Sequence, residues 1–453
     1  MYFIIADVTD LAEGSNSEIV IRKRTELNKR RREQYNKATE EERSQRNKLR
    51  CDRRAKQKIN AIECQQVNNG VSNTSSFSLC CSHGKVKLPN LQETPPELKR
   101  LLDGTDELSK AFRKNYRMYN TAFSFTSTGG EIDKRYNNGG GPFVYRIFGE
   151  IYHQIGSLYP DDGEKPVYSQ IYMYDNQQEV EKRVSFPHND ELLDTRIIKT
   201  ITEMLDRENE LAKFFHSIHN RDVIVHYKGG GLHRISELSP SYMALQYPLI
   251  FPFGEDAFRT DILHRGVSTH TATKKDKVSI REFYAYRIQQ RSNEGHTLIR
   301  GGRLFLQFVV DAYACIEHSR LMWVKLHQET LRADVYNNIV DSVNRGDADA
   351  ITVGKRIVLP ATFTGSPRYM QQNYQDCMAV CRKLGSPDLF ITFTCNPAWP
   401  EIKEHCNKIV NQTPDVRPDI ISRVFKIKLD MLLEDLTQNH VLGKVIGGTI
   451  VLK

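Results

Sequence analysis

The spacing of hydrophobic residues changes along this chain and divides it into differently patterned zones. Residues 18–60 carry few apolar side chains and neither proline nor glycine, a pattern typical of a solvated helix or a disordered arm. GGGPFVYRIFGEIYHQIGSL and KPVYSQIYMYD alternate apolar and polar side chains, which predicts paired strands. Residues 275–453 contain longer stretches with apolar residues three or four positions apart, which predicts packed helices. Together the patterns predict an α+β protein.

Several helices are predicted with their ends. PPELKRLLDG begins on prolines and ends on Gly104. DELSKAFRKNYRMYNTAFSF and DELLDTRIIKTITEMLDRENELAKFFHSIHN each predict one helix. KVSIREFYAYRIQQR is also helical by pattern. From residue 301 onward, long helices are predicted with one apolar stripe through Phe305, Phe308, Val309, Tyr313, Ile316, Leu321 and Trp323.

The last hundred residues predict helices alternating with strands. RIVLP, LFITFT and GKVIGGTIVLK are predicted strands. Helix 371–384 is expected to stop at Gly385, and a second helix covers 419–438.

Within LFITFTCNP, strand geometry separates two faces. Phe390, Thr392 and Thr394 share one face, and Leu389, Ile391, Phe393 and Cys395 share the other. The second set is more apolar, so we expect it to pack against helix 371–384 or helix 419–438. Asn396 is expected to cap the turn after the strand, with Pro397 at the first position of a helical turn.

Composition fits a globular protein of two or three domains. The chain has 453 residues, 39% of them hydrophobic and 26% charged. The zones suggest a basic helical or disordered arm (1–60), a Cys/His segment (61–94), a mixed α+β region (95–270) and a more regular region (271–453).

Charge is concentrated in the arm. The formal net charge is +8. Residues 21–58 hold 16 lysines and arginines against six acids. The densest positions are Arg30, Arg31, Arg32, Arg53 and Arg54. They would neutralise phosphates of a nucleic acid or act as a nuclear localisation patch. The alternative is a charged arm that only meets solvent.

Targeting and membrane signals are not expected. MYFIIADVTD lacks the basic residues that precede a signal peptide's apolar core, and no apolar run reaches about 18 residues. Nine scattered cysteines indicate a reduced, intracellular protein.

Metal-ligating and phosphate-binding patterns are weak. One Cys/His cluster consists of Cys64, Cys80, Cys81 and His83. It lacks the two close pairs of ligands that are usual in a structural zinc site, so reduced buried thiols are the alternative to a zinc site there. His216 and His219 are explained by a helix C-terminus as well as by a metal. The glycines of residues 128–141 predict a flexible loop rather than a phosphate cradle, because strand-loop-helix order is missing.

One block resembles a known family. TGSPRYMQQNYQDCMAVCRKLGSPDLFITFTCNPAWPEI resembles the Helitron helicase-like domain, the replication-initiator region of Helitron rolling-circle transposases. FSLCCSHGKVKLPNL, GPFVYRIFGEIYHQIGSLYPDDGEKPVYSQIYMYD and YMALQYPLIFPFGEDAF resemble upstream segments of the same proteins. LFITFTCNP is similar to the family's first motif strand, to which Thr392, Phe393, Thr394, Asn396, Pro397 and Trp399 would belong.

The resemblance implies a single-strand DNA nuclease that uses a His-hydrophobic-His metal site followed by nucleophilic tyrosines. The closest histidines here are His216 and His219, and the last tyrosine is Tyr374. No Gly-Lys is followed by the Ser or Thr of a nucleotide-binding loop. We therefore expect no catalytic residues and no metal in these 453 residues. Mg²⁺ or Mn²⁺ would enter only with the missing module.

The sequence thus predicts a truncated Helitron transposase-like chain with an incomplete nuclease-like sheet. It would be nuclear and bind DNA through the arm, without nicking or helicase activity, membrane contact or an identifiable protein partner. Two alternatives stay open. The chain is half of a split endonuclease completed by another chain, or it is a host-adopted DNA-binding or scaffold protein.

Overall fold

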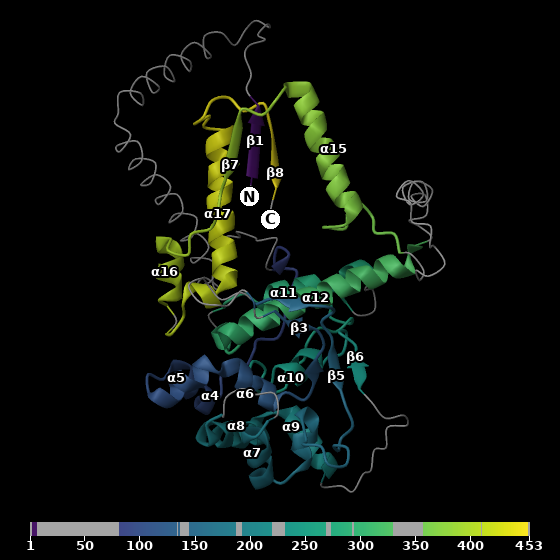
Figure 1. Cartoon of the computed structure of the whole chain (residues 1–453), viewed down its shortest axis with the longest axis vertical. Coiled ribbons are helices and arrows are strands. Elements are labelled where there is room, and N and C mark those ends of the chain that lie inside the picture. The colour runs from purple at the N-terminus through teal and green to yellow at the C-terminus, as the bar shows by residue number, and fades with distance from the viewer. Residues whose placement is uncertain are drawn as a thin grey trace, which may run out of the picture. The chain divides into compact units, whose positions relative to one another are not determined.

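The computed structural model describes residues 2–6, 81–133, 135, 145–186, 193–219, 232–268, 273–291, 294–328, 357–408 and 410–451. The chain divides into two compact units (Figure 1). The helical unit comprises Gln66–Arg320 and Lys403–Asp419. The sheet unit combines Met1–Gln65, Leu321–Ile402 and Ile420–Lys453.

Short helices make up most of the helical unit. The α-helices are α4 (Pro96–Asp103), α5 (Glu107–Lys114), α6 (Tyr116–Phe123), α7 (Asn176–Val184), α8 (Thr195–Glu208), α9 (Glu210–His219), α10 (Tyr242–Gln246), α11 (Ile280–Arg287) and the start of α12 (Arg303–Leu326). The 3-10 helices are η1 (Tyr168–Met173), η2 (Lys274–Asp276), η3 (Ile299–Gly301) and η5 (Pro414–Val416).

Side-chain caps fix where several of these helices begin. Asp106 accepts a hydrogen bond from the Ser109 amide at the start of α5. Ser279 and Glu282 form a reciprocal capping box at the start of α11. Each cap satisfies an amide that has no partner inside its own helix.

One hydrophobic core joins these helices. Its fully buried members include Leu98 of α4, Phe112 of α5, Ile197 and Ile201 of α8, and Phe305 and Phe308 of α12. A smaller cluster around Phe125, Tyr172 and Phe215 packs rings from α9 and η1. Burial of this apolar surface is the main force that holds the unit together.

Two small antiparallel sheets complete the unit. One has the order β2-β5-β6, with β2 at Ser127–Thr128, β5 at His153–Ile155 and β6 at His233–Ile235. The other pairs β3 (Glu131–Ile132) with β4 (Ile147–Phe148). GGGPFVYRIFGEIYHQIGSL therefore does supply strands, but β4 and β5 belong to different sheets.

KPVYSQIYMYD is not a strand. Its centre is η1, in which Ile171, Tyr172 and Met173 are all buried. Three consecutive buried side chains cannot share one face of a strand. Alternation holds only as far as Ile171, because Ile171, Tyr172 and Met173 follow one another without a polar residue between them.

The two long predicted helices are each divided by an asparagine. Asn115 ends α5 and precedes α6. Asn209 has an extended backbone after α8, and its Oδ1 accepts hydrogen bonds from the Leu211 and Ala212 amides at the start of α9. Asparagine competes well for backbone amides, so it favours a break where a hydrophobic pattern alone predicts continuity.

The predicted stripe of α12 is only partly correct. Phe305 and Phe308 are buried, whereas Tyr313, Leu321 and Trp323 are exposed. Tyr313 lies five positions after Phe308, which turns its side chain well away from the buried face at 3.6 residues per turn.

The sheet unit is built on a three-stranded antiparallel sheet with the order β7-β1-β8 (Figure 1). β1 (Tyr2–Ala6) is the middle strand, β7 is Leu389–Thr392 and β8 is Gly447–Val451. Phe3 is opposite both Ile391 and Ile450. The apolar start of the chain is thus a strand, which the sequence pattern did not predict. RIVLP forms no strand over its described residues, 357–360.

Three helices accompany this sheet: α15 (Pro367–Leu384), α16 (Pro400–Cys406) and α17 (Pro418–Thr437). The division between the units cuts both of the later helices. α16 begins in the sheet unit and continues beyond Ile402, and α17 begins shortly before Ile420, where the last segment of the sheet unit starts. Ser366 caps α15, and Gly385 ends it with a φ of 92°, as expected from the glycine at that position. α15 lies against β8, because a Cβ on Gly447 would come within 2.4 Å of Leu384 Cδ1.

Among the described residues, none of the helices combines the length and apolar character that crossing a bilayer requires.

Candidate functional site

β7 and the residues after it carry the family-like motif, and their burial alternates. Ile391, Phe393 and Cys395 are half-buried, whereas Phe390, Thr392 and Thr394 are exposed. The predicted division into two faces is confirmed for these six residues. Leu389 is the exception, because it lies exposed at the start of the strand.

The turn after β7 is fixed by Asn396. Its Oδ1 accepts a hydrogen bond from the Ala398 amide at 2.9 Å, and its carbonyl accepts one from the Trp399 amide at 3.1 Å. Asn396 therefore caps this turn, as predicted, and Pro397 occupies its second position. The following α-helix begins later, at Pro400.

Aromatic rings anchor this turn to α17. The Phe393 ring stacks with Phe425 of α17 at 5.3 Å and with Trp399 at 6.0 Å between centroids. Lys428 of α17 lies 5.0 Å from the Trp399 ring centroid and donates a 2.8 Å hydrogen bond to Glu401. The packing of the strand against the second predicted helix is confirmed by these contacts.

The motif residues thus divide by environment. Phe393, Asn396 and Trp399 fix the strand and its turn, whereas Thr392 and Thr394 present hydroxyls to solvent. Phe390, beside them, is 65% exposed. A ligand that reaches β7 on this face meets one aromatic ring and two hydroxyl groups.

The other predicted binding residues are only partly described. Arg30, Arg31, Arg32, Arg53 and Arg54 lie outside the described residues, as do Cys64 and Cys80. Cys81 is half-buried and His83 is exposed. DNA contact through the arm stays a prediction, and the alternatives of buried thiols and a zinc site near Cys81 both stay open.

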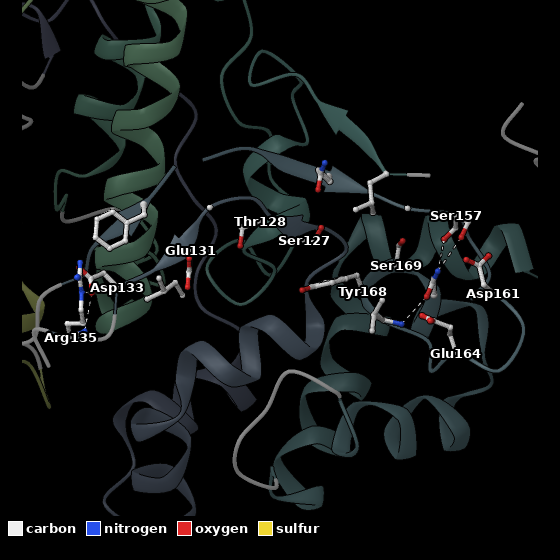
Figure 2. A pocket seen from close by; sticks show the side chains of 18 residues that line it. Ser127, Thr128, Glu131, Asp133, Arg135, Ser157, Asp161, Glu164, Tyr168 and Ser169 are labelled. Carbon is white, nitrogen blue, oxygen red and sulfur yellow. Dashed lines mark hydrogen bonds and ion pairs between the residues drawn. The ribbon is translucent and has the colours of Figure 1, made fainter. Parts of the chain in front are cut away.

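A large polar pocket lies in the helical unit, with a volume of about 1310 Å³. β2, β3 and β5 meet η1 around it, and the side chains of Glu131, Asp133, Asp161 and Glu164 line it together with Arg135 (Figure 2). Hydrogen bonding from Arg135 lowers the pKa of the Asp133 carboxyl, so this group is ionised. Four carboxyl groups and one guanidinium make the pocket a poor place for a phosphodiester.

A buried polar network joins β5, α10 and α12. His153 Nε2 lies 2.6 Å from Asp311 Oδ2, and Tyr247 donates a 2.9 Å hydrogen bond to the same oxygen. The His153 ring stacks on Tyr242 at 3.8 Å. His153, Asp311 and Tyr247 are all buried. The network therefore ties the strand to the core, and it does not present a reactive group to a substrate.

One group among the described residues has the donor set of a metal site: Glu179, Asp206 and His216. Their candidate ligand atoms lie within 4.8 Å of one another. Burial lowers the pKa of His216, but the Asp206 hydrogen bond and the Glu179 charge outweigh it, so the net pKa is raised. Burial raises the pKa of Glu179 against the opposing effect of Arg183.

Sequence reasoning missed this cluster. It weighed His216 only with His219, whereas the partners of His216 come from α7 and α8. No spacing in the sequence links Glu179, Asp206 and His216, because three separate helices bring them together.

Comparison with known proteins identifies the C-terminal region. Residues 283–451 match the family described as the Helitron helicase-like domain at N-terminus. This region is therefore a Helitron helicase-like domain. The family resemblance is thereby confirmed, while that of segments before Phe283 stays a prediction. None of the curated proteins matches the chain.

Proposed function

We propose that this chain is a Helitron transposase-related protein that binds single-stranded DNA. The basic arm would supply most of the affinity, and the exposed face of β7 would supply a stacking surface. The observation that carries the proposal is the exposure of one face of the strand, where the motif residues Thr392 and Thr394 lie beside Phe390.

The chemistry of β7 supports a single strand rather than a duplex. Every base offers an aromatic face, and stacking on an exposed ring is tolerant of sequence. Thr392 and Thr394 offer hydroxyl donors and acceptors next to Phe390. A duplex keeps its bases stacked inside the helix, where this strand face would not reach them.

The composition of the arm supports a polyanion partner. Residues 21–58 carry ten more positive than negative charges, counted from 16 basic and six acidic residues. Such a segment binds phosphates without reading sequence. We further propose a nuclear location, since the same arginine pairs and triplets fit a nuclear localisation patch.

The function is tested by binding of the full chain to a fluorescent 30-nucleotide single strand of mixed sequence, in competition with the matching duplex. Phe390→Ala is expected to weaken single-strand binding by about 1–3 kcal/mol, the value of one stacked base. The matched control is Phe214→Ala, which removes an exposed ring (58% exposed) from α9 in the helical unit. This control is expected to bind like the unaltered chain.

Two results would contradict the proposal. Equal affinities of the Phe390→Ala and Phe214→Ala variants would remove β7 from the binding surface. Preference for the duplex would point to a host-adopted duplex-binding protein instead. The same incubations with Mg²⁺ or Mn²⁺ are expected to leave the strand uncut, and a covalent protein–DNA adduct would favour the split-enzyme alternative.

A further inference from the structure

We propose that Glu179, Asp206 and His216 form a binding site for a single transition-metal dication, with Zn²⁺ as the best-fitting ion. The site lies within the helical unit and does not depend on the DNA-binding surface of β7. Its three donors come from α7, α8 and α9, so an ion bound there would join three helices.

The distances suit an ion of this kind. His216 Nε2 lies 3.1 Å from Asp206 Oδ1 and 3.6 Å from Glu179 Oε2. Ligand atoms at about 2.0–2.1 Å from a tetrahedral zinc are separated by about 3.3–3.4 Å. The two observed separations lie on either side of this value. The third separation, between the two carboxylates, is at most 4.8 Å, so side-chain rotations would place all three donors around one ion.

Glu179 provides the strongest sign that a ligand is missing. Its side chain is 1% exposed, and its Oε2 accepts no hydrogen bond. Buried Asp206 Oδ2 also accepts none. A buried carboxylate oxygen without a hydrogen bond is costly, and here Glu179 Oε2 has only the His216 ring, at 3.6 Å, in exchange for its lost water. A cation at this position would give Glu179 Oε2 a partner, and it would reach Asp206 Oδ2 only if Asp206 bound through both oxygens.

Arg183 orients Glu179 for this role. Its guanidinium donates from Nε and Nη2 to Glu179 Oε1 and from Nη1 to the Ala122 carbonyl. The guanidinium carbon also lies 4.3 Å from the ring centroids of both Phe123 and Tyr172. With Oε1 held in this way, Oε2 is the oxygen turned toward His216, so Glu179 would be a monodentate ligand.

The donor types select the ion. One imidazole and two carboxylates suit Zn²⁺ and its neighbours better than Mg²⁺, which prefers oxygens and keeps its waters. Three protein ligands leave a fourth position for water. His216 is 20% exposed and Asp206 is 22% exposed, so an ion can enter from solvent.

The rival explanation is an ion-pair cluster with a protonated His216. In that case a proton shared with Asp206 and Glu179 takes the place of the metal. The two explanations differ in one respect: an imidazole must lose its proton before Nε2 can bind a metal. Metal binding would therefore release a proton and weaken as the pH falls, whereas the ion-pair cluster would bind no metal at any pH.

The test uses the full chain, stripped with a chelator and titrated with Co²⁺ as a spectroscopic probe for the zinc site. We expect one Co²⁺ per chain with visible absorption but without a thiolate-to-cobalt charge-transfer band, because no cysteine belongs to the site. This distinguishes it from any site near Cys81. Zn²⁺ should displace the Co²⁺, and an excess of Mg²⁺ should not.

Two variants and a control locate the ion. His216→Gln and Asp206→Asn should each reduce Co²⁺ affinity at least about tenfold, and circular dichroism verifies that each is folded. The control is His318→Gln. His318 also lies between two carboxylates, but Glu150 is 3.4 Å from its Nδ1 and Glu237 is 3.4 Å from its Nε2, so these acids cannot converge on one ion. It should leave binding unchanged.

The proposal is overturned if the stripped chain binds no Co²⁺ or Zn²⁺ saturably. It is equally overturned if Asp206→Asn binds Co²⁺ as tightly as the unaltered chain. Either result would identify the three residues as a buried ion-pair cluster only.

Discussion

Glu255 is a single residue whose ionisation should change the stability of the helical unit. Burial raises the pKa of its carboxyl from 4.5 to about 7. Its Oε2 accepts a hydrogen bond from the Phe253 amide at 3.1 Å. Between pH 4.5 and 7 the folded chain therefore holds a proton that the unfolded chain has lost. The free energy of unfolding must fall as the pH rises through this window.

Glu255→Gln removes this titration and keeps the shape of the side chain. The free energy of unfolding of the variant should exceed that of the unaltered chain by a margin that grows with pH and reaches up to about 3 kcal/mol above pH 7. Urea unfolding followed by circular dichroism at pH 5 and pH 8 measures the difference. Glu203→Gln, at an exposed position of α8, is the control. A stability gain for Glu255→Gln that is the same at both pH values would contradict the assignment.

Individual residues also mark where the sequence was informative and where it was not. Asn396 was predicted as a cap because its position after a strand and before proline is a local signal. The contact between His153 and Asp311, residues 158 positions apart, has no local signal. The same applies to the donors around His216. Side chains that meet across helices are determined by tertiary packing, which the periodicity of one segment does not contain.

Gly447 is where α15 approaches β8. A Cβ at this position would come within 2.4 Å of Leu384 Cδ1 and 3.5 Å of Val380 Cγ1. Gly447→Val should therefore overpack this contact and destabilise the sheet unit by about 1–3 kcal/mol. Tryptophan fluorescence follows its unfolding, because Trp323 and Trp399, the two tryptophans of the sequence, both belong to this unit.

Two further variants distinguish the effect of overpacking against α15 from the effect of replacing a glycine within a strand. Gly448→Val, at the exposed neighbouring position, should not destabilise the unit. Adding Leu384→Ala to Gly447→Val should restore part of the loss, because it removes the nearest atoms. If the 447 and 448 variants unfold at the same urea concentration, α15 does not approach β8 closely enough for a Cβ at position 447 to meet Leu384.

At the level of elements, periodicity predicted whether a segment is a helix or a strand better than it predicted where that element begins and ends. Helix 371–384 was found as α15 with its stop at Gly385, because glycine beyond a helix is a strong local signal. Helices α5 and α6 were predicted as one, since hydrophobic spacing continues across Asn115. β1 was missed because five apolar residues before a charged stretch do not reveal their partners, β7 and β8.

For the whole molecule, the distribution of charge predicts how DNA binding responds to salt. Arg30, Arg31, Arg32, Arg53 and Arg54 would all be replaced by glutamine. The slope of log affinity against log salt concentration should then become less steep by about 0.7 for each single-strand phosphate contact that is lost. Fluorescence anisotropy between about 50 and 200 mM salt measures this slope.

The matched control removes equal charge elsewhere. It changes five lysines that the structure describes as exposed in the helical unit: Lys99, Lys110, Lys199, Lys213 and Lys277. This control should lower affinity only slightly, with little change of slope. Equal slopes for both five-fold variants would show that net charge, rather than the arm, controls binding.

The position of β1 between β7 and β8 has a consequence for how the protein is made. Tyr2 pairs with Thr392 and with Val451, so the ribosome must add hundreds of residues before the middle strand has either neighbour. The helical unit's core contacts can form meanwhile. Until β7 and β8 emerge, β1 exposes strand edges that other chains could pair with. Chaperone protection of nascent chains would matter most during that interval.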